Sequence, residues 1–131
     1  MALKAFRVGP LPANQINKAL SLELGVGDVW VSRACHRHIK FDHAQDYPLI
    51  KAHIVDIITD PTWVGQDAKH GATVYLVRKL PVEQETGFAL IAVGLEITEY
   101  GTYSVRSAYA IKREDVDTRI LRGSLKRIMP A

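Results

Sequence analysis

Apolar residues recur at helical spacing in the first half of the chain. One set predicts a short helix over residues 12–20, capped by Asn14: Ile16, Leu20 and Leu24. A second set predicts a helix from Pro48 to Asp60: Ile50, Ile54, Ile57 and Ile58. Between these helices, residues 29–31 predict a brief strand, and Ser32 can cap a third helix.

The second half of the chain has the patterns typical of strands. Residues 73–80 alternate, a turn is expected at residues 83–87, and the almost wholly apolar residues 88–97 predict a central strand buried on both faces. A tight turn at residues 99–101 leads into a strand over residues 102–112, while residues 63–71 are expected to form a polar loop. These elements predict an α+β fold, with N-terminal helices packed on a C-terminal antiparallel sheet of about four strands.

Length and composition predict a single domain over residues 1–131 with a sizeable core. No apolar run approaches the roughly 18 residues of a membrane span, and the first residues lack the apolar stretch of a signal peptide. The single cysteine, Cys35, excludes an internal disulfide framework and disfavours a thiolate metal site. We therefore expect a cytoplasmic site of action and no membrane partner.

The net charge of +3 is a mild bias. Residues 112–127 can account for all of it, because six basic side chains there face three acidic ones: Lys112, Arg113, Arg119, Arg122, Lys126 and Arg127 against Glu114, Asp115 and Asp117. A basic tail suits a polyanion such as RNA, although a solvated surface strand or helix is the more ordinary interpretation.

Three of the five histidines fall within eight residues: His36, His38 and His43. Histidine titrates near neutral pH, so two histidines at one site can act as acid and base in phosphodiester cleavage. A metal site is disfavoured, because His36 and His38 would lie roughly 200° apart on a helix. His36 and His43 would share a face two turns apart, with Lys40 between them.

For any single histidine, a helix cap or a wet surface is the more ordinary role. His53 borders the apolar helix face and is expected to be structural, and His70 is expected to lie solvated in a loop. Phosphodiester cleavage also needs a cation that stabilises the pentacoordinate phosphate, for which the candidates are Arg37, Lys40, Lys79 and Arg106.

Alternation divides the strand predicted over residues 102–112 into two faces. One face carries Tyr103, Ser107 and Tyr109, and the other carries Ser104, Arg106 and Lys112. Ser107 and Tyr109 could hydrogen-bond a phosphate or stack a base, while a plain solvent-facing stripe is the alternative.

Several short motifs resemble one nuclease family. His38-Ile39-Lys40-Phe41-Asp42-His43, followed by Tyr47-Pro48-Leu49-Ile50 and Ile57-Ile58-Thr59-Asp60-Pro61, is similar to a layout "H-I-x-x-x-H … I-I-x-(D/N)-P". Phage-associated barnase–EndoU–colicin–RelE-like (BECR-fold) nucleases have this layout, and Ser107-Ala108-Tyr109 resembles their "(S/T)-A-Y" element. The order of helices and then an antiparallel sheet is similar too, so the resemblance covers about residues 29–126.

The resemblance implies a metal-independent endoribonuclease, often a toxin, in which a 2′-hydroxyl attacks the adjacent phosphate without a cofactor. Carried over to this chain, His38 and His43 match the family's histidine pair, and Ser107 and Tyr109 match its strand element. His36 has no counterpart in the family pattern, and the family varies in its catalytic cation.

The resulting hypothesis gives each candidate a role. One of His38 and His43 takes the 2′-hydroxyl proton, and the other, or a strand residue, protonates the 5′-oxygen. Arg106 or Lys79 stabilises the phosphorane, while Ser107 and Tyr109 position the phosphate. Further substrate-binding candidates are His36, Lys40, Lys79 and Lys112.

The hypothesis names RNA as the substrate, with tRNA among the candidates, and an immunity or antitoxin protein as a candidate partner. Delivery as a toxin or as a phage-borne domain stays open. The alternative is a non-catalytic RNA- or protein-binding module on the same scaffold, which would tolerate loss of a histidine. A metal hydrolase, the third class, would lose its activity in a chelator.

Overall fold

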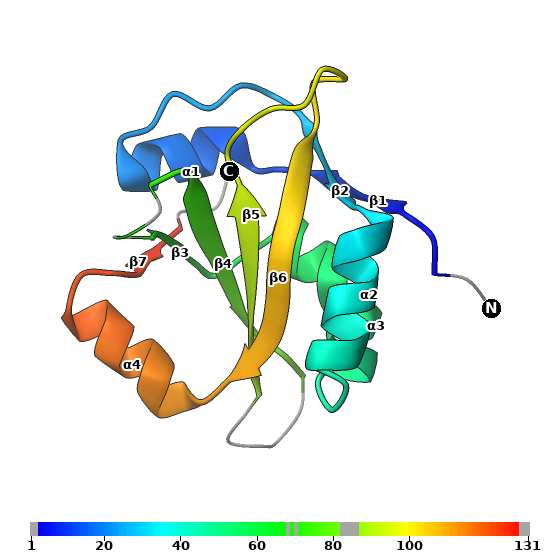
Figure 1. The fold of residues 1–131 in the computed structure, drawn as a ribbon. Coiled ribbons are helices and arrows are strands. Elements are labelled where there is room, and N and C mark those ends of the chain that lie inside the picture. The colour runs from blue at the N-terminus through cyan, green and yellow to red at the C-terminus, as the bar shows by residue number, and fades with distance from the viewer. Residues whose placement is uncertain (1–2, 68, 70, 82–86, 129–131) are drawn as a thin grey trace.

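One mixed β-sheet runs through the described part of the chain, which in this computed structural model is residues 3–67, 69, 71–81 and 87–128 (Figure 1). Its seven strands are β1 (Phe6–Pro10), β2 (Asp28–Val31), β3 (Trp63–Gln66), β4 (Thr73–Lys79), β5 (Phe88–Gly94), β6 (Tyr103–Ile111) and β7 (Lys126–Arg127). The helices are α1 (Ala13–Leu20), α2 (Arg33–Asp42), α3 (Tyr47–Thr59) and α4 (Arg113–Leu121). The strand order is β1-β2-β6-β5-β4-β3-β7.

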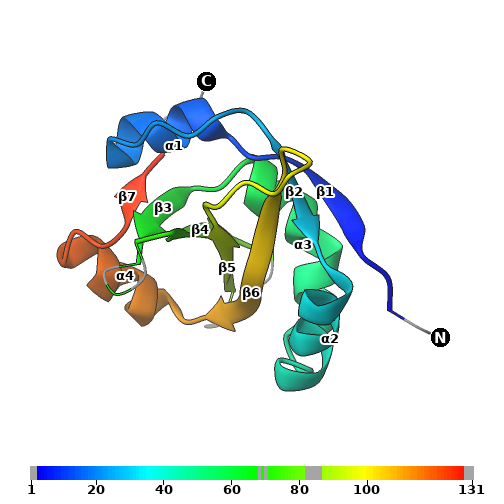
Figure 2. The same ribbon diagram turned by 45° about the horizontal axis from the view of Figure 1, so that its top comes forward.

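The predicted fold class is wrong in its strand number and in the place of its helices. β1 and β2 come before α2 and α3, and α4 follows β6, so helices lie between and around the strands instead of N-terminal to them. β2 runs parallel to β6, while the other neighbouring strands are antiparallel, so the sheet is mixed. Figure 2 shows β7 at one edge of the sheet, between α1 and α4.

Two of the unexpected strands, β3 and β7, are short, and β7 forms an edge of the sheet. β3 forms where a polar loop was predicted, and it pairs with β4 on one side and with β7 on the other. Gly65 makes room for the C-terminal segment, because a side chain at this position would collide with the backbone oxygen of Ser124. His70 and residues 83–86 of the predicted turn lie outside the described residues.

Most local signals for the helices are confirmed. The Ser32 hydroxyl accepts a hydrogen bond from the Cys35 amide, 3.1 Å away, and so caps α2 as predicted. α3 occupies the predicted segment, with Pro48 in its first turn. Asn14 is not a cap, because Pro12 takes that position in α1. The basic tail contains α4 and β7, so it forms both a surface helix and a short strand.

Two apolar clusters lie on opposite faces of the sheet. The larger contains residues of α1, α2 and α3 with inward residues of the strands, among them Ile16, Ile39, Ile57, Leu76 and Ile91. The smaller contains the alternate strand positions Val77, Phe88, Leu90, Ala92 and Ile111, together with Val116 of α4 and Leu125 beyond that helix. β5 is buried at every position, as predicted for the central strand.

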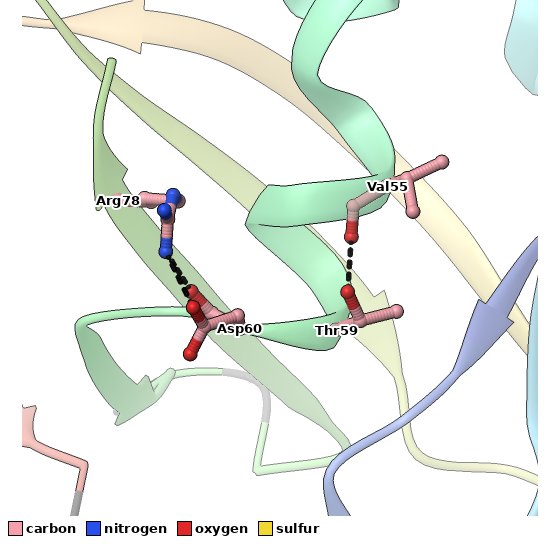
Figure 3. Close-up of polar contacts among 4 residues, drawn as sticks. All are labelled: Val55, Thr59, Asp60 and Arg78. Carbon is pink, nitrogen blue, oxygen red and sulfur yellow. Dashed lines mark hydrogen bonds and ion pairs between the residues drawn. The ribbon is translucent and has the colours of Figure 1, made fainter. Parts of the chain in front are cut away.

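The end of α3 is fastened to β4 by an arginine (Figure 3). Arg78 Nη1 donates hydrogen bonds to the Asp60 carbonyl oxygen at 2.6 Å and to its carboxylate Oδ2 at 3.0 Å. The Thr59 hydroxyl donates to the Val55 carbonyl oxygen at 2.7 Å, within the last turn of the helix.

In the described ranges, no helix has the length and apolar character that crossing a membrane requires.

Candidate functional site

A hollow of about 500 Å³ opens on the face of the sheet that carries the smaller apolar cluster. Along this face of β5 the side chains become smaller, from Phe88 and Leu90 to Ala92 and Gly94, so the surface deepens toward the end of the strand. We call this the β5 hollow, and it is lined by Asp67, Gly71, Ala72, Thr73, Tyr75, Ala92, Arg106, Ser107 and Tyr109.

A β-bulge in β6 brings Arg106 and Ser107 to the hollow together. Ala92 pairs with Ser107 and the next residue, Val93, pairs with Val105, so Arg106 is an extra residue in the strand. The predicted division of β6, which put Arg106 and Ser107 on opposite faces, is therefore wrong. Alternation cannot hold across the bulge.

The Arg106 side chain lies across Gly94. A Cβ atom at Gly94 would be 2.7 Å from Arg106 Nε, closer than real Cβ atoms approach a neighbour. The absence of a side chain at Gly94 thus gives the guanidinium its place at the hollow.

Tyr103 also departs from the predicted face of β6. Its side chain is fully buried in the larger cluster, and its hydroxyl donates a hydrogen bond to the Gly25 carbonyl oxygen at 2.6 Å. Tyr103 is therefore a core residue, whereas Ser107 and Tyr109, as predicted, share the face with the hollow.

One of the clustered histidines stacks on Tyr109, and a second packs against the first. The rings of His43 and Tyr109 stack with centroids 5.4 Å apart, and His38 meets His43 edge to face at 5.5 Å. His38 Nδ1 lies 2.6 Å from Asp42 Oδ2. We call these four residues, Asp42, His38, His43 and Tyr109, the histidine row, which leads from α2 to the β5 hollow.

His43 can reach this position because it has left the helix. Residues five apart on a continuous helix point about 140° away from each other, which would separate His38 from His43. His43 is the C-cap of α2, with φ −124° and ψ 45°, so the direction of its side chain does not follow the helical repeat. The predicted helix included His43, so the contact between the two rings was not expected.

Asp46 fastens the turn between α2 and α3 to β6. β2 pairs with β6 only at Tyr103 and Ser104, and beyond that point α2 lies alongside β6 (Figure 1). The Asp46 carboxylate accepts a hydrogen bond from the Ala110 amide at 3.0 Å, so it satisfies a peptide N–H on this edge of β6. Because Ala110 follows Tyr109, this bond fixes the position of His43 relative to Tyr109.

Two residues that line the hollow, Tyr75 and Asp67, and Arg119 beside Tyr75 were not predicted as site residues. The Tyr75 hydroxyl donates to Asp67 Oδ2 at 2.5 Å, and the Arg119 guanidinium lies 5.4 Å from the Tyr75 ring centroid. Burial, with Asp67 adding to it, raises the pKa of Tyr75 to about 12, so its hydroxyl stays a neutral donor at physiological pH. Alternation places Tyr75 with Val77 on one face of β4, and this was the one sequence signal that could have identified Tyr75 as a site residue.

His36 has a different role from the other two clustered histidines. It is buried, its Nδ1 lies 2.9 Å from the Lys4 carbonyl oxygen, and its Nε2 lies 2.6 Å from the Tyr47 hydroxyl. Its ring also packs against those of Phe6 and Tyr47. Both ring nitrogens are engaged inside the protein, so we leave His36 out of the substrate-binding set and assign it to packing.

The structure does not bring the three candidate lysines to the β5 hollow. Lys40 Nζ lies 5.8 Å from the Tyr47 ring centroid, and Lys112 is exposed at the N-cap of α4. Lys79 lines a second hollow of about 420 Å³, together with His53, Asp56, Arg78, Leu80 and Pro81. We call this the α3 hollow. Of the four candidate cations Arg37, Lys40, Lys79 and Arg106, it is Arg106 that lines the β5 hollow.

Over the described ranges, no three His, Cys, Asp or Glu side chains are grouped so that they could hold a metal ion.

Comparisons of the chain with protein-family models, with curated proteins and with solved structures find no match. Function is therefore inferred from the β5 hollow and the histidine row.

Proposed function

We propose that this protein is a metal-independent endoribonuclease that cleaves RNA by attack of a 2′-hydroxyl on the adjacent phosphate. One observation carries the proposal: the His43 ring packs against His38 and stacks on Tyr109, which lines a hollow with Arg106. In-line cleavage needs a base, an acid and positive charge at the phosphorane, and these side chains have that chemistry. The resemblance of the histidine and strand motifs to those of BECR-fold nucleases supports the same reaction.

The two histidines divide the proton transfers. The carboxylate of Asp42 accepts from Nδ1–H of His38, which leaves Nε2 as the lone-pair nitrogen of the neutral ring. His38 or His43 takes the proton of the 2′-hydroxyl as the bond from this oxygen to phosphorus forms. The bond from phosphorus to the 5′-oxygen breaks, and the other histidine or Tyr109 protonates that oxygen, leaving a 2′,3′-cyclic phosphate.

Arg106 and Ser107 bind the phosphate in this proposal. A guanidinium can make two parallel hydrogen bonds to phosphate oxygens, and the Ser107 hydroxyl can add a third. Because the bulge puts both residues at the β5 hollow, they can act on one phosphate. Such an enzyme would act on cytoplasmic RNA, tRNA among the candidates, and a toxin of this kind would need an immunity or antitoxin protein.

Incubation with total tRNA in EDTA, followed by end-group analysis, tests the proposal. We expect cleavage that leaves 2′,3′-cyclic phosphate and 5′-hydroxyl ends. Loss of cleavage in EDTA would point to a metal hydrolase. RNA binding without cleavage, unchanged by loss of either histidine, would favour a non-catalytic binding module.

Tyr109→Phe removes one hydroxyl and keeps the ring that stacks on His43. We expect turnover to fall several-fold while the melting temperature changes little, because the half-buried ring keeps its packing. A structural hydroxyl would instead leave an orphaned partner and cost about 1 kcal/mol or more of stability. The rate and the melting temperature of this variant separate the two cases, and unchanged turnover would remove the hydroxyl from the reaction.

Asp46→Ala should lower turnover through the position of His43. The variant loses the acceptor for the Ala110 amide, so the turn that carries His43 is no longer fastened beside Tyr109. Asp46→Asn keeps an oxygen acceptor and should restore most of the turnover. The positioning role is tested by measuring kcat and KM for both variants. We expect Asp46→Ala to change kcat more than KM. An equal loss of turnover in Asp46→Ala and Asp46→Asn would contradict the role.

A further inference from the structure

The floor of the β5 hollow has a small side chain between two tyrosines. Tyr75, Ala92 and Ser107 lie opposite one another on three neighbouring strands, with the smallest apolar side chain in the middle. Tyr109 follows Ser107 on the same face, one row further along β6. The small side chain of Ala92 therefore leaves a notch between the Tyr75 ring on β4 and the Tyr109 ring on β6.

The wall formed by Tyr75 is held in place from two directions. Its hydroxyl is bonded to Asp67, and the Arg119 guanidinium lies over its ring. A ring fixed in this way loses little conformational entropy when a flat ligand packs against it. The hollow thus offers a preformed surface for an aromatic ligand.

The chemistry around the notch suits a nucleotide. The volume of the β5 hollow, about 500 Å³, lies in the range of small-ligand sites, roughly 300–1,000 Å³. Arg106 lines the hollow on the β6 side, and the Arg119 guanidinium lies 5.4 Å from the Tyr75 ring centroid on the β4 side. A base between the tyrosines would have the Arg106 cation beside it for an adjacent phosphate.

We propose that the β5 hollow binds one unstacked nucleobase, so that the substrate is single-stranded RNA and not a duplex. The substrate part of this inference rests on the proposed function. Bases in an A-form duplex are paired and stacked, whereas loops and single strands can place a base against aromatic side chains and arginine planes. Ala92 and Tyr75 are then determinants of substrate binding.

The test uses a non-cleavable probe, so that binding is measured apart from catalysis. A fluorescent 2′-O-methyl RNA of about 12 nucleotides containing all four bases is titrated with protein, alone and annealed to its 2′-O-methyl complement. We expect the single strand to bind about tenfold or more tightly than the duplex, the scale of one base stacked on one ring. Equal binding of the two forms overturns the inference.

Variants of the hollow give a second, independent measurement. Tyr75→Leu should weaken binding of the single strand by about 5- to 100-fold, and Tyr75→Phe should restore most of it because the ring remains. Ala92→Val should weaken binding by filling the notch. Tyr100→Leu is the matched control, since Tyr100 is 83% exposed in the hairpin between β5 and β6 and lies outside the hollow.

Each outcome bears on one proposal. Tyr75→Leu and Ala92→Val proteins that melt cooperatively and bind like the parent overturn the inference. If Ala92→Val does not fold, the Tyr75 pair and the strand comparison still decide. Tight single-strand binding without cleavage of the matching ribose strand overturns the proposed function alone, whereas cleavage with no preference for single strands overturns the inference alone.

Discussion

Replacement of His43 by alanine should lower the rate of RNA cleavage by about 10²–10⁴-fold and leave the fold intact. His43 is half-buried at the end of α2, and its ring contacts are with His38 and Tyr109. Within the described residues it belongs to neither apolar cluster. Its removal therefore takes away an acid or base and little packing.

His53→Ala is the matched control for His43→Ala. His53 lies on α3 and lines the α3 hollow with Lys79, so its loss should leave the rate of cleavage unchanged. Rates with a tRNA substrate and thermal melting curves are measured for both variants. Should His43→Ala lose its cooperative melt together with its activity, His43 is structural and the histidine row is not a catalytic arrangement.

Arg106→Ala should lower kcat by about 10²–10³-fold, the usual cost of removing one group that stabilises charge in a transition state. The guanidinium is at the β5 hollow, beside Ser107 and near the histidine row. Lys79→Ala removes the cation that the sequence offered as the alternative. Because Lys79 lines the α3 hollow, this variant should keep its kcat within about twofold of the parent.

Gly94→Ala tests the same cation without changing any charge. The new Cβ would collide with Arg106 Nε and move the guanidinium from its place. We expect part of the loss seen for Arg106→Ala, with the melting temperature recorded for both. A large loss in Lys79→Ala, together with an active Arg106→Ala, would contradict the assignment of Arg106.

The parts of the site that the sequence could predict depend on local signals. The Ser32 cap and the apolar faces of α2 and α3 place the histidine cluster on a helix next to a turn. The short motif at residues 107–109 lies on a strand, as predicted, and it meets His43 at Tyr109. These features follow from residues close together in the sequence, for which cap and periodicity rules apply.

The rest depends on contacts between distant segments. The parallel pairing of β2 with β6 and the position of β3 between β4 and β7 depend on the whole sheet, and the four residues of β3 carry too little alternation to be recognised as a strand. The bulge at Arg106 adds one residue to β6, which no two-residue period can register. Tyr75 on β4 and Arg119 on α4 lie far apart in the sequence, so their contact could not be predicted from either residue.

Cleavage of two matched oligonucleotides in EDTA, each tested separately, checks the central claim most directly. One oligonucleotide is all ribose, and the other has the same sequence with a 2′-deoxynucleotide at the position that is cut. The proposed mechanism predicts that the ribose strand is cleaved to a 2′,3′-cyclic phosphate end and that the substituted strand stays intact at that position. Equal cleavage of both strands would contradict attack by the 2′-hydroxyl.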